Sequence, residues 1–565
     1  KRQASLFDSE EIKQKERQLK IAKHKIFSAR RPTTKEKWRN EVVRLRKEIA
    51  DLLLEKDCIG NEQAAQLAQW DMFDQNTFAP FFDPEWMFGI KEGFDILIAN
   101  PPYISTKGVS TADKKLFEAE FGFSDDTYNL FFFKGFSLLC EGGCITYITP
   151  KTFWTTQTKR NLRDLLLANT LNYVFDTANP FEAVMVDTCI TSAVKNKPAA
   201  ENLVRFMDGR KSLLQPERLT VAQSVYLNTQ NSVIFKPSEL NMRIYELYGE
   251  KVKALYDKWW DKIKTSREIE KNKRELEEYR ASLKPGDVAL LGCLTEGGQG
   301  LATANNGKYI AVRSTTKWAE NIRVSRPKKL ADFLARTPKA ITAEMRRYPS
   351  YVAFLQSLSE AEIAELFDSL KEQYGRDIFG QGYLYKIVDD CEIADVDSLT
   401  NDEKENGIET TKPYYVPYDK GDKDGNRWYL ETPFAIAWSK ENVRFLKTDP
   451  KARYQGYTFY FREGLCWSDI NTTFLKCRIK QKSIHDVKSM SIFGVCDKVP
   501  EKYILCVINS TLISYYVDTF VNNTQTFQIN DARQLPIIVP TSEQLSFCSA
   551  LAKACLLYTS PSPRD

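Results

Sequence analysis

The sequence predicts an α/β fold with a mostly parallel sheet for the segment from residue 93 to residue 196. Three observations support this prediction: apolar runs of strand length, helical segments between them, and turn residues at their boundaries. Strands that alternate with helices are typical of a parallel sheet with crossover helices. The expected strands are residues 94–100, 144–150, 171–178 and 187–196, and the expected helices are residues 127–143 and 158–169.

A charged helical segment precedes this sheet. Residues 9 to 57 are rich in Lys, Arg and Glu, carry apolar residues at helical spacing, and are interrupted by "RRPTT". This pattern predicts a helical hairpin whose charges form a solvated face rather than a DNA-binding one. We therefore assign residues 1–57 to the hairpin and residues 58–235 to the domain that contains the sheet.

Two further regions follow the sheet. Residues 236–290 predict a helical connector, which ends at "KPGD", and residues 291–554 predict a separate domain of mixed strands and helices. Both chain ends are expected to be cut. Lys1 stands within a charged helical pattern, which indicates missing sequence upstream, and residues 555–565, "CLLYTSPSPRD", match a translated transposase adapter from sequencing libraries.

Composition limits the possible chemistry. A chain of 565 residues predicts two to four domains, and a net charge of +5 neither requires nor excludes a nucleic-acid partner. The 12 cysteines are scattered, which favours reduced core thiols, and only two histidines are present. A histidine base or a metal site is therefore not expected. The sequence has no membrane-length apolar run and no signal-peptide core at its start, so we expect a cytoplasmic protein.

One short stretch suggests a reaction. "FDILIANPPYIS", residues 94 to 105, places Asn100, Pro101, Pro102 and Tyr103 directly after a predicted buried strand. Ligands of such sheets lie beyond the carboxyl ends of the strands, so these residues should form an edge of the site.

The residue types in this stretch fit the alkylation of an exocyclic amine. Adenine N6 is a poor nucleophile because its lone pair is delocalised into the ring. The side-chain carbonyl of Asn100 and the backbone carbonyl of Pro101 would accept its two N–H bonds, while the prolines hold the loop rigid. Tyr103 would provide a flat stacking surface.

The motif "NPPY" after a strand resembles the catalytic motif of N6-adenine DNA methyltransferases of the gamma arrangement. The wider resemblance is to type IIG and related restriction-modification or phage-defence methylases. It is carried by "WDMFDQNTFAPFFDPEWMFGI", "YNLFFFKGFSLLCEGGCITYITPKTFW", "NPFEAVMVDTCI", "ARYQGYTFYFREGLCWSDI" and "VINSTLISYYVDTFVNNTQTFQINDARQLPIIVP".

The resemblance implies a fold, a reaction and partners. The fold would be a Rossmann-like S-adenosylmethionine-dependent methyltransferase domain, incomplete at its N-terminus, followed by the connector and a mixed α/β target-recognition domain. S-adenosylmethionine would be the cofactor, and double-stranded DNA with a specific target sequence would be the substrate, with restriction or defence subunits as further partners. The adenine would be flipped out of the duplex and held between Tyr103 and Phe181.

This sequence also departs from the family. The glycine-containing cofactor loop does not appear in residues 1–93, and we expect it upstream of Lys1. Asp71 and Asp74 are weak candidates for cofactor contacts and are more typical of solvated loop carboxylates. Residues 297–300, "GGQG", favour a hairpin or recognition loop over a phosphate loop. No nuclease motif is found in the sequence.

Two alternative functions stay open. Enzymes that methylate glutamine amides in proteins share the Asn-Pro-Pro-Tyr signature, but they are compact and do not need a long C-terminal domain. A methylase-like protein without catalysis could instead serve as the DNA-recognition part of a defence complex. Intact Asn100 and Tyr103 argue against that second alternative.

Overall fold

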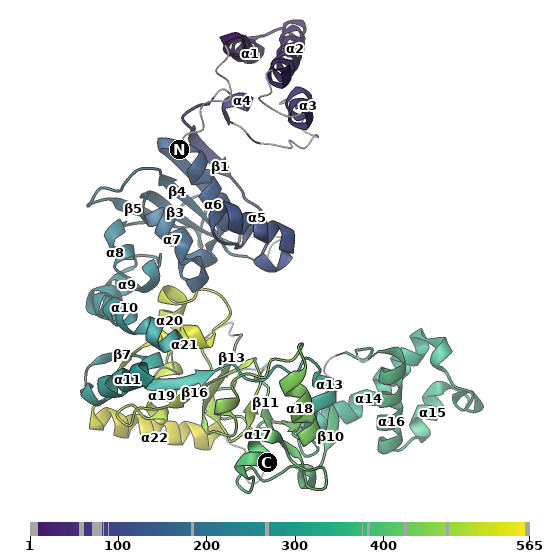
Figure 1. Ribbon diagram of the computed structural model, residues 1–565. Helices are drawn as coiled ribbons and strands as arrows, with labels where there is room; N and C mark the ends of the chain where they lie inside the picture. The colour runs from purple at the N-terminus through teal and green to yellow at the C-terminus, as the bar shows by residue number, and fades with distance from the viewer. Residues whose placement is uncertain are drawn as a thin grey trace. The chain divides into compact units, whose positions relative to one another are not determined.

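The structure is a computed structural model in which the chain forms two compact units (Figure 1). The first unit contains residues 1–149, 168–175 and 188–199, and the second contains residues 150–167, 176–187 and 200–565. The residues that the structure describes are 10–55, 61–70, 82, 84–88, 90–181, 186–265, 270–375, 377–380, 385–422, 426–470 and 474–559.

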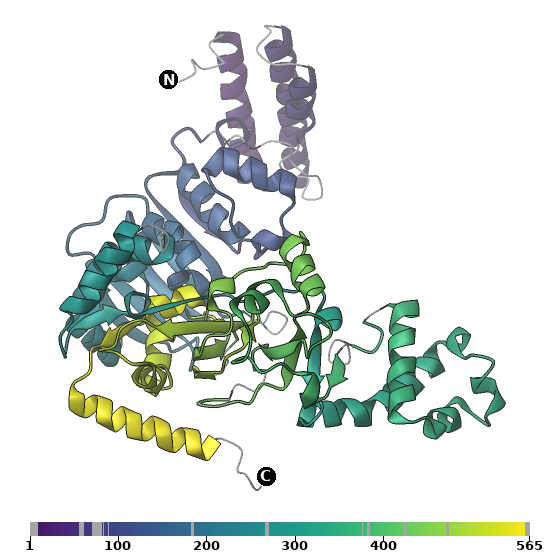
Figure 2. The same ribbon diagram turned by 60° about the horizontal axis from the view of Figure 1, so that its bottom comes forward.

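Two antiparallel helices begin the described part of the first unit. Helix α1 (Glu10–Ser28) and helix α2 (Pro32–Glu55) lie side by side in both ribbon views (Figure 2). Apolar residues at helical spacing meet between them, because each helix has one buried stripe. Two short helices, α3 (Asn61–Gln69) and α4 (Pro84–Phe88), follow. The buried residues of this core are Ile12, Leu19, Ala22, Ile26, Val42, Leu45, Ile49 and Leu53.

A six-stranded sheet follows, with the strand order β1-β2-β4-β3-β5-β6. Strands β1 and β2 are parallel, whereas β5 and β6 are antiparallel. As β2 advances from Gly142 to Lys151, its partners run backwards from Lys195 to Asp187, so β4 is antiparallel to β2. The sheet is therefore mixed, and the prediction of a mostly parallel sheet was wrong, because β4 inserts between β2 and β3 in the reverse direction. The strands are β1 (Phe94–Ala99), β2 (Leu139–Pro150), β3 (Thr170–Ala178), β4 (Thr188–Val194), β5 (Leu203–Asp208) and β6 (Glu217–Ala222).

The helix predicted over residues 127–143 is shorter than expected. Helix α6 ends at Leu138 and β2 begins at Leu139, which pairs with Phe94 of β1. Strand pairing overrides the helical pattern of residues 139–143: Leu139 pairs with β1, and the backbone groups of Gly142 and Gly143 bond Lys195, the residue after β4. The helices of this region are η1 (Thr106–Gly108), α5 (Thr111–Phe121), α6 (Thr127–Leu138), η2 (Lys151–Trp154), η3 (Gln157–Lys159), α7 (Arg160–Leu167), α8 (Gln223–Leu227) and η4 (Gln230–Ser232).

The predicted helical connector is present in the second unit. It contains α9 (Glu239–Ile244), the π-helical turn η5 (Tyr245–Gly249), α10 (Glu250–Thr265) and α11 (Glu270–Ser282). Its apolar stripe is buried in a cluster that includes Tyr256, Trp259, Trp260 and Ile263. The connector is thus a packed helical layer rather than an extended linker.

Mixed strands and helices make up the rest of the second unit. A five-stranded sheet has the order β10-β9-β12-β11-β15, a four-stranded sheet has the order β14-β13-β16-β8, and β17 pairs with β7. The strands are β7 (Val288–Leu290), β8 (Thr295–Gly298), β9 (Ile310–Arg313), β10 (Lys386–Val388), β11 (Tyr415–Asp419), β12 (Phe434–Ala437), β13 (Gly464–Ser468), β14 (Arg478–Lys480), β15 (Ile484–His485), β16 (Ser489–Gly494) and β17 (Pro536–Ile538). These elements confirm the predicted fold class, an α/β sheet domain followed by a helical connector and a mixed α/β region.

Helices of this part surround and extend the sheets. They include α14 (Lys317–Arg336), η6 (Pro338–Ala340), η7 (Met345–Arg347), α15 (Tyr351–Ser357), α16 (Glu360–Tyr374) and α20 (Thr511–Phe520). The others are α12 (Leu291–Leu294), α13 (Asn306–Tyr309), η9 (Asp390–Glu392), α17 (Asn401–Asn406), α18 (Lys440–Thr448), η10 (Tyr457–Phe459), α19 (Glu501–Ile508), α21 (Ile529–Arg533) and α22 (Ser542–Thr559). Among the helices described, none has the length and apolar character needed to span a bilayer.

Candidate active site at the end of strand β1

The predicted catalytic residues form the loop that leaves β1. Strand β1 ends at Ala99, which pairs with Tyr147 of β2, and Asn100 is the first residue beyond the strand. Asn100 and Pro102 are exposed, whereas Pro101 is buried. The buried proline anchors the loop, and its neighbour Asn100 stands at the carboxyl end of a parallel strand pair, where α/β sheets bind ligands.

Thr127, the first residue of α6, holds this loop in place. Its hydroxyl donates a 2.5 Å hydrogen bond to the carbonyl oxygen of Pro102, and it accepts a 3.0 Å hydrogen bond from the backbone N–H of Ile104. The backbone N–H of Thr127 in turn donates to the carbonyl oxygen of Ile104 at 3.0 Å. Three hydrogen bonds therefore fix the backbone of residues 102–104 against the start of α6.

A second set of contacts extends this attachment. Asp126, the residue before α6, accepts hydrogen bonds from the backbone N–H and the hydroxyl of Thr106 at 2.9 and 3.1 Å. Asp125 accepts a 2.5 Å hydrogen bond from the side-chain amide of Asn129, which is fully buried. The sequence "DDTYN" thus serves as a clamp for the loop. This role was not predicted from the sequence, although two carboxylates directly precede the predicted helix.

Tyr103 is oriented by the neighbouring strand. Its hydroxyl donates a 3.0 Å hydrogen bond to the carbonyl oxygen of Ile148 in β2, and its side chain is half-buried. Burial raises the pKa of Tyr103 above its ordinary value, so the phenol stays protonated as the donor. The hydrogen bond fixes the hydroxyl end of the side chain at β2, so the aromatic ring is held beside the loop.

The loop leaves two acceptors unused. Among the residues that the structure describes, none donates a hydrogen bond to the side chain of Asn100 or to the carbonyl oxygen of Pro101. The next carbonyl, that of Pro102, is already engaged by Thr127. The rigid loop therefore offers one side-chain carbonyl and one adjacent backbone carbonyl to a ligand with two N–H donors.

Of the other predicted site residues, the structure describes Phe181 but not Asp71 or Asp74. Phe181 lies in the loop after β3, is 37% exposed, and has its backbone N–H bonded to the side-chain carbonyl of Asn179 at 3.2 Å. It belongs to the second unit and Tyr103 to the first, so the pairing of these rings stays a prediction. Asp71 and Asp74 lie outside the described residues.

A charged cluster in the second unit was not predicted. Lys151, the first residue after β2, lies 2.9 Å from the carboxylate of Asp187 and 3.4 Å from that of Asp176. Burial alone would lower the pKa of Lys151, but the two carboxylates raise it above its ordinary value. The Asp518 carboxyl has its pKa raised, mainly by burial. The feature of the sequence that could have indicated this cluster is the lysine directly after a predicted strand, in "ITPK".

Trp467, Ser468 and Asp469 of the second unit have partners within the protein. Trp467 is 1% exposed and donates a hydrogen bond to the carbonyl oxygen of Phe527 at 2.9 Å. Ser468 bonds the backbone of Asp422, and the carboxylate of Asp469 pairs with Lys488 at 2.6 Å. Trp467 is therefore part of the protein interior, and the partly buried Ser468 is engaged by the backbone of Asp422.

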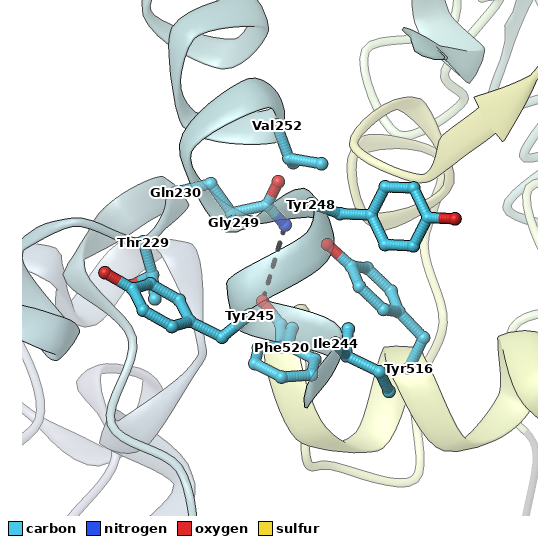
Figure 3. Close-up of a pocket in the computed structure, with 9 residues that line it drawn as sticks. All are labelled: Thr229, Gln230, Ile244, Tyr245, Tyr248, Gly249, Val252, Tyr516 and Phe520. Carbon is cyan, nitrogen blue, oxygen red and sulfur yellow. Dashed lines mark hydrogen bonds between the residues drawn. The ribbon is translucent and has the colours of Figure 1, made fainter. Parts of the chain in front are cut away.

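A small cavity borders the connector (Figure 3). Tyr516 and Phe520 of α20 face the π-helical turn η5, and the Gln230 amide donates to the carbonyl oxygen of Phe520 at 3.4 Å. Its volume of 20 Å³ admits about one water molecule and is far too small for a nucleobase. This cavity is therefore not the binding site for a flipped adenine.

Among the described residues that precede β1, none forms a strand, so a strand-loop-helix cradle for a cofactor is not found there. The described residues also contain no group of three or more His, Cys, Asp or Glu side chains arranged to hold a metal ion. Within the described residues, the loop of residues 100–103 is a polar acceptor site at a sheet edge. An Asn-Pro-Pro-Tyr loop after a strand of an α/β sheet is the arrangement expected from the resemblance of the sequence to methyltransferases.

Comparison with known proteins agrees with this class. Residues 10–181 match the model of the Eco57I restriction-modification methylase family, which confirms the resemblance expected from the sequence for that part of the chain. A protein of Methanocaldococcus jannaschii, described as a type II restriction enzyme and methyltransferase, is 29% identical over 116 residues. Those residues are 20% of this chain and 10% of that relative. The matched region is thus similar to methylases of restriction-modification systems.

Solved structures with partial similarity come from the same systems. The type IIL restriction-modification enzyme MmeI, in complex with DNA, has a TM-score of 0.40 and 11% identity, covering 83% of this chain and 50% of that one. The type IIG restriction endonuclease BpuSI has a TM-score of 0.24 and 13% identity, covering 82% and 48%. This chain spans half or less of each of these proteins.

Proposed function

We propose that this chain contains the catalytic and target-recognition parts of a site-specific DNA adenine methyltransferase of a restriction-modification or phage-defence system. The observation that carries the proposal is the pair of free acceptors, the Asn100 side-chain carbonyl and the Pro101 carbonyl, on a loop fixed by Thr127. The match of residues 10–181 to a restriction-modification methylase family supports it.

The proposed role of the loop is to activate and position an amine. Adenine N6 presents two N–H bonds, and Asn100 and Pro101 accept one each. Accepting both bonds localises the nitrogen lone pair and directs it out of the ring plane. Because the loop is already rigid, little reorganisation is needed when the base arrives.

Access to N6 inside a duplex requires that the base leave the stack. We infer that Tyr103 stacks on the extruded adenine, with Phe181 as the second aromatic surface. Such stacking is worth about 1–3 kcal/mol per base. The hydrogen bond from Tyr103 to Ile148 holds the hydroxyl end of this side chain in place.

The proposed methyl donor is S-adenosylmethionine, which supplies an electrophilic methyl group. The described residues before β1 do not offer a cradle for it, so we derive no step through the cofactor. We expect the 565-residue chain by itself to bind S-adenosylmethionine weakly and to methylate poorly. Calorimetric titration of the chain with S-adenosylmethionine tests this expectation, and tight binding would contradict it.

A substrate comparison tests the proposal against its alternatives. The complete gene product is incubated with S-adenosylmethionine carrying a labelled methyl group, and with either duplex DNA or a glutamine-containing peptide. Label in adenine of the DNA supports the proposal, whereas label in the peptide supports a protein-glutamine methyltransferase. DNA binding without transfer to either substrate would support a non-catalytic recognition protein.

A further inference from the structure

Part of the second unit folds around a core of its own. We call residues 317–379 the helical insertion; it contains α14, η6, η7, α15 and α16. In both ribbon views α15 and α16 gather beside the distal part of α14 (Figures 1 and 2). The buried residues of this core are Leu330, Phe333, Leu334, Ala340, Met345, Phe354, Leu355, Phe367, Leu370 and Phe379. An independent core allows the surface of the insertion to change without unfolding the sheets.

Charge is separated within the insertion. Residues 317–347 contain nine lysines and arginines against three acidic residues, whereas residues 348–379 contain two against six. The first half alone has a net charge of +6, compared with +5 for the whole chain. The cations are therefore concentrated on the segment from α14 to η7, rather than spread evenly.

The local fold directs several of these cations into solvent. Ala340 is 5% exposed and Met345 is 2% exposed, so both residues anchor their short turns to the core. The side chains around these anchors are exposed because the anchors occupy the inward positions. Five exposed cations of this segment, which we call the basic face, are Lys328, Arg336, Lys339, Arg346 and Arg347.

The acidic residues of segment 348–379 do not neutralise the basic face. Glu360 at the start of α16 pairs with Arg323 at 2.6 Å, and Asp368 pairs with Lys371 within α16 at 2.5 Å. Arg336 bonds a backbone carbonyl, that of Asp332, at 3.0 Å. None of the ion pairs recorded for the described residues involves Arg346 or Arg347.

We propose that the basic face of the helical insertion binds the phosphate backbone of duplex DNA without reading its sequence. This inference rests on the proposed function, because it assigns a second contact surface to the same DNA substrate. Arginine matches phosphate geometry with two donors, and a group of exposed cations gains binding free energy when phosphate contacts release condensed counterions. Phosphate contacts of this kind fix position and orientation but do not specify bases.

Salt dependence of DNA binding tests this surface. The full chain and the double variant Arg346→Glu/Arg347→Glu are titrated against a fluorescently labelled duplex of arbitrary sequence between 50 and 200 mM salt. The matched control is Lys273→Glu/Arg274→Glu on the exposed face of α11, which changes the net charge by the same amount. All proteins are first checked for an unchanged thermal unfolding midpoint.

The proposal predicts different slopes for the two variants. For Arg346→Glu/Arg347→Glu, the slope of log K against log salt concentration should decrease in magnitude by about 2. Each lost phosphate contact lowers the magnitude of this slope by about 0.9. The Lys273→Glu/Arg274→Glu control should keep the slope of the parent chain, and Arg346→Lys/Arg347→Lys should keep most of it. Equal slopes for both glutamate variants would overturn the proposal.

Two further outcomes separate this inference from the proposed function. A parent chain that binds no duplex at low salt would contradict both. A chain that binds duplex equally well with and without Arg346 and Arg347, yet loses binding to anionic phospholipid vesicles, would overturn the DNA assignment in favour of a lipid surface. The proposed methylation would survive that second result.

Discussion

The hydroxyl of Thr127 donates a 2.5 Å hydrogen bond to the carbonyl oxygen of Pro102. This contact joins the start of α6 to the middle of the proposed catalytic loop. It also engages the Pro102 carbonyl, so the carbonyl of Pro101 is the adjacent one left for substrate. The role of the loop therefore depends on a residue outside the motif that identifies it.

Removing this hydroxyl should reduce catalysis more than stability. Thr127→Val keeps the size of the side chain but loses two hydrogen bonds, the one donated to Pro102 and the one accepted from the N–H of Ile104, each worth about 1 kcal/mol. A loop displaced by even a fraction of an ångström lowers the rate, and we expect kcat to fall by at least about tenfold. Methylation kinetics of the complete gene product measure this effect, and Thr127→Ser serves as the control that restores the donor. Equal rates for the parent protein and Thr127→Val would contradict the positioning role.

The two chemical features of Tyr103 can be separated. Tyr103→Phe keeps the ring and loses only the hydrogen bond to Ile148, so base stacking should persist. Tyr103→Ala removes the ring and should weaken the complex with an extruded base by about 1–3 kcal/mol. Fluorescence of 2-aminopurine at the target position reports extrusion. A signal that survives Tyr103→Ala would show that another residue stacks on the base.

The position of the loop of residues 100–103 after a strand could be predicted from the sequence because its signal is local. A strand, an asparagine and two prolines in succession restrict the backbone without help from distant residues. The clamp at Thr127 was missed because its partners are more than 20 residues apart and become neighbours only when α6 packs beside the loop. The direction of β4 was missed for the same reason, since strand order and direction are set by long-range pairing.

A buried ion pair joins strand β11 to strand β14 in the second unit. The guanidinium of Arg478 lies 2.8 Å from the carboxylate of Asp419, and both side chains are buried. Burial alone would raise the pKa of Asp419, but the charge of Arg478 and hydrogen bonds from Ser489, Cys466 and Gly421 lower it below its ordinary value. The carboxylate is thus fully paired.

Breaking this pair should be costly. Asp419→Ala leaves the guanidinium of Arg478 buried without its partner, and we expect the free energy of unfolding to fall by about 3–5 kcal/mol. Urea denaturation followed by circular dichroism measures the change. The exposed pair Lys440 and Glu409 provides the control, because Glu409→Ala should leave the urea midpoint unchanged. Similar midpoints for both variants would contradict the structural role of the buried pair.

His485 should make stability depend on pH. It is fully buried against Tyr460 and Phe493, and burial, helped by the charge of Lys480, lowers its pKa to about 3. Between pH 3 and the ordinary histidine pKa of about 6.5, the unfolded state binds the proton and the folded state does not. This contribution to stability is therefore present above about pH 6.5 and declines as the pH falls, by about 1.4 kcal/mol at pH 5.5.

Comparison with a non-titrating variant isolates this effect from other groups. Asp531 acts in the opposite direction, since burial raises its pKa to about 6. The difference in unfolding free energy between the parent chain and His485→Phe should therefore change by about 1.4 kcal/mol between pH 7.5 and pH 5.5. A difference that stays constant over this range would show that His485 titrates normally.

The central claim is that Asn100 takes part in methylating adenine N6 in DNA. The most direct measurement expresses the complete gene, and the same gene with Asn100→Ala, in a host that lacks adenine methylation, and maps N6-methyladenine by long-read sequencing. We predict one methylated sequence motif with the parent gene and none with Asn100→Ala. Methylation that persists in the Asn100→Ala strain, or no methylation in either strain despite abundant folded protein, would contradict the account.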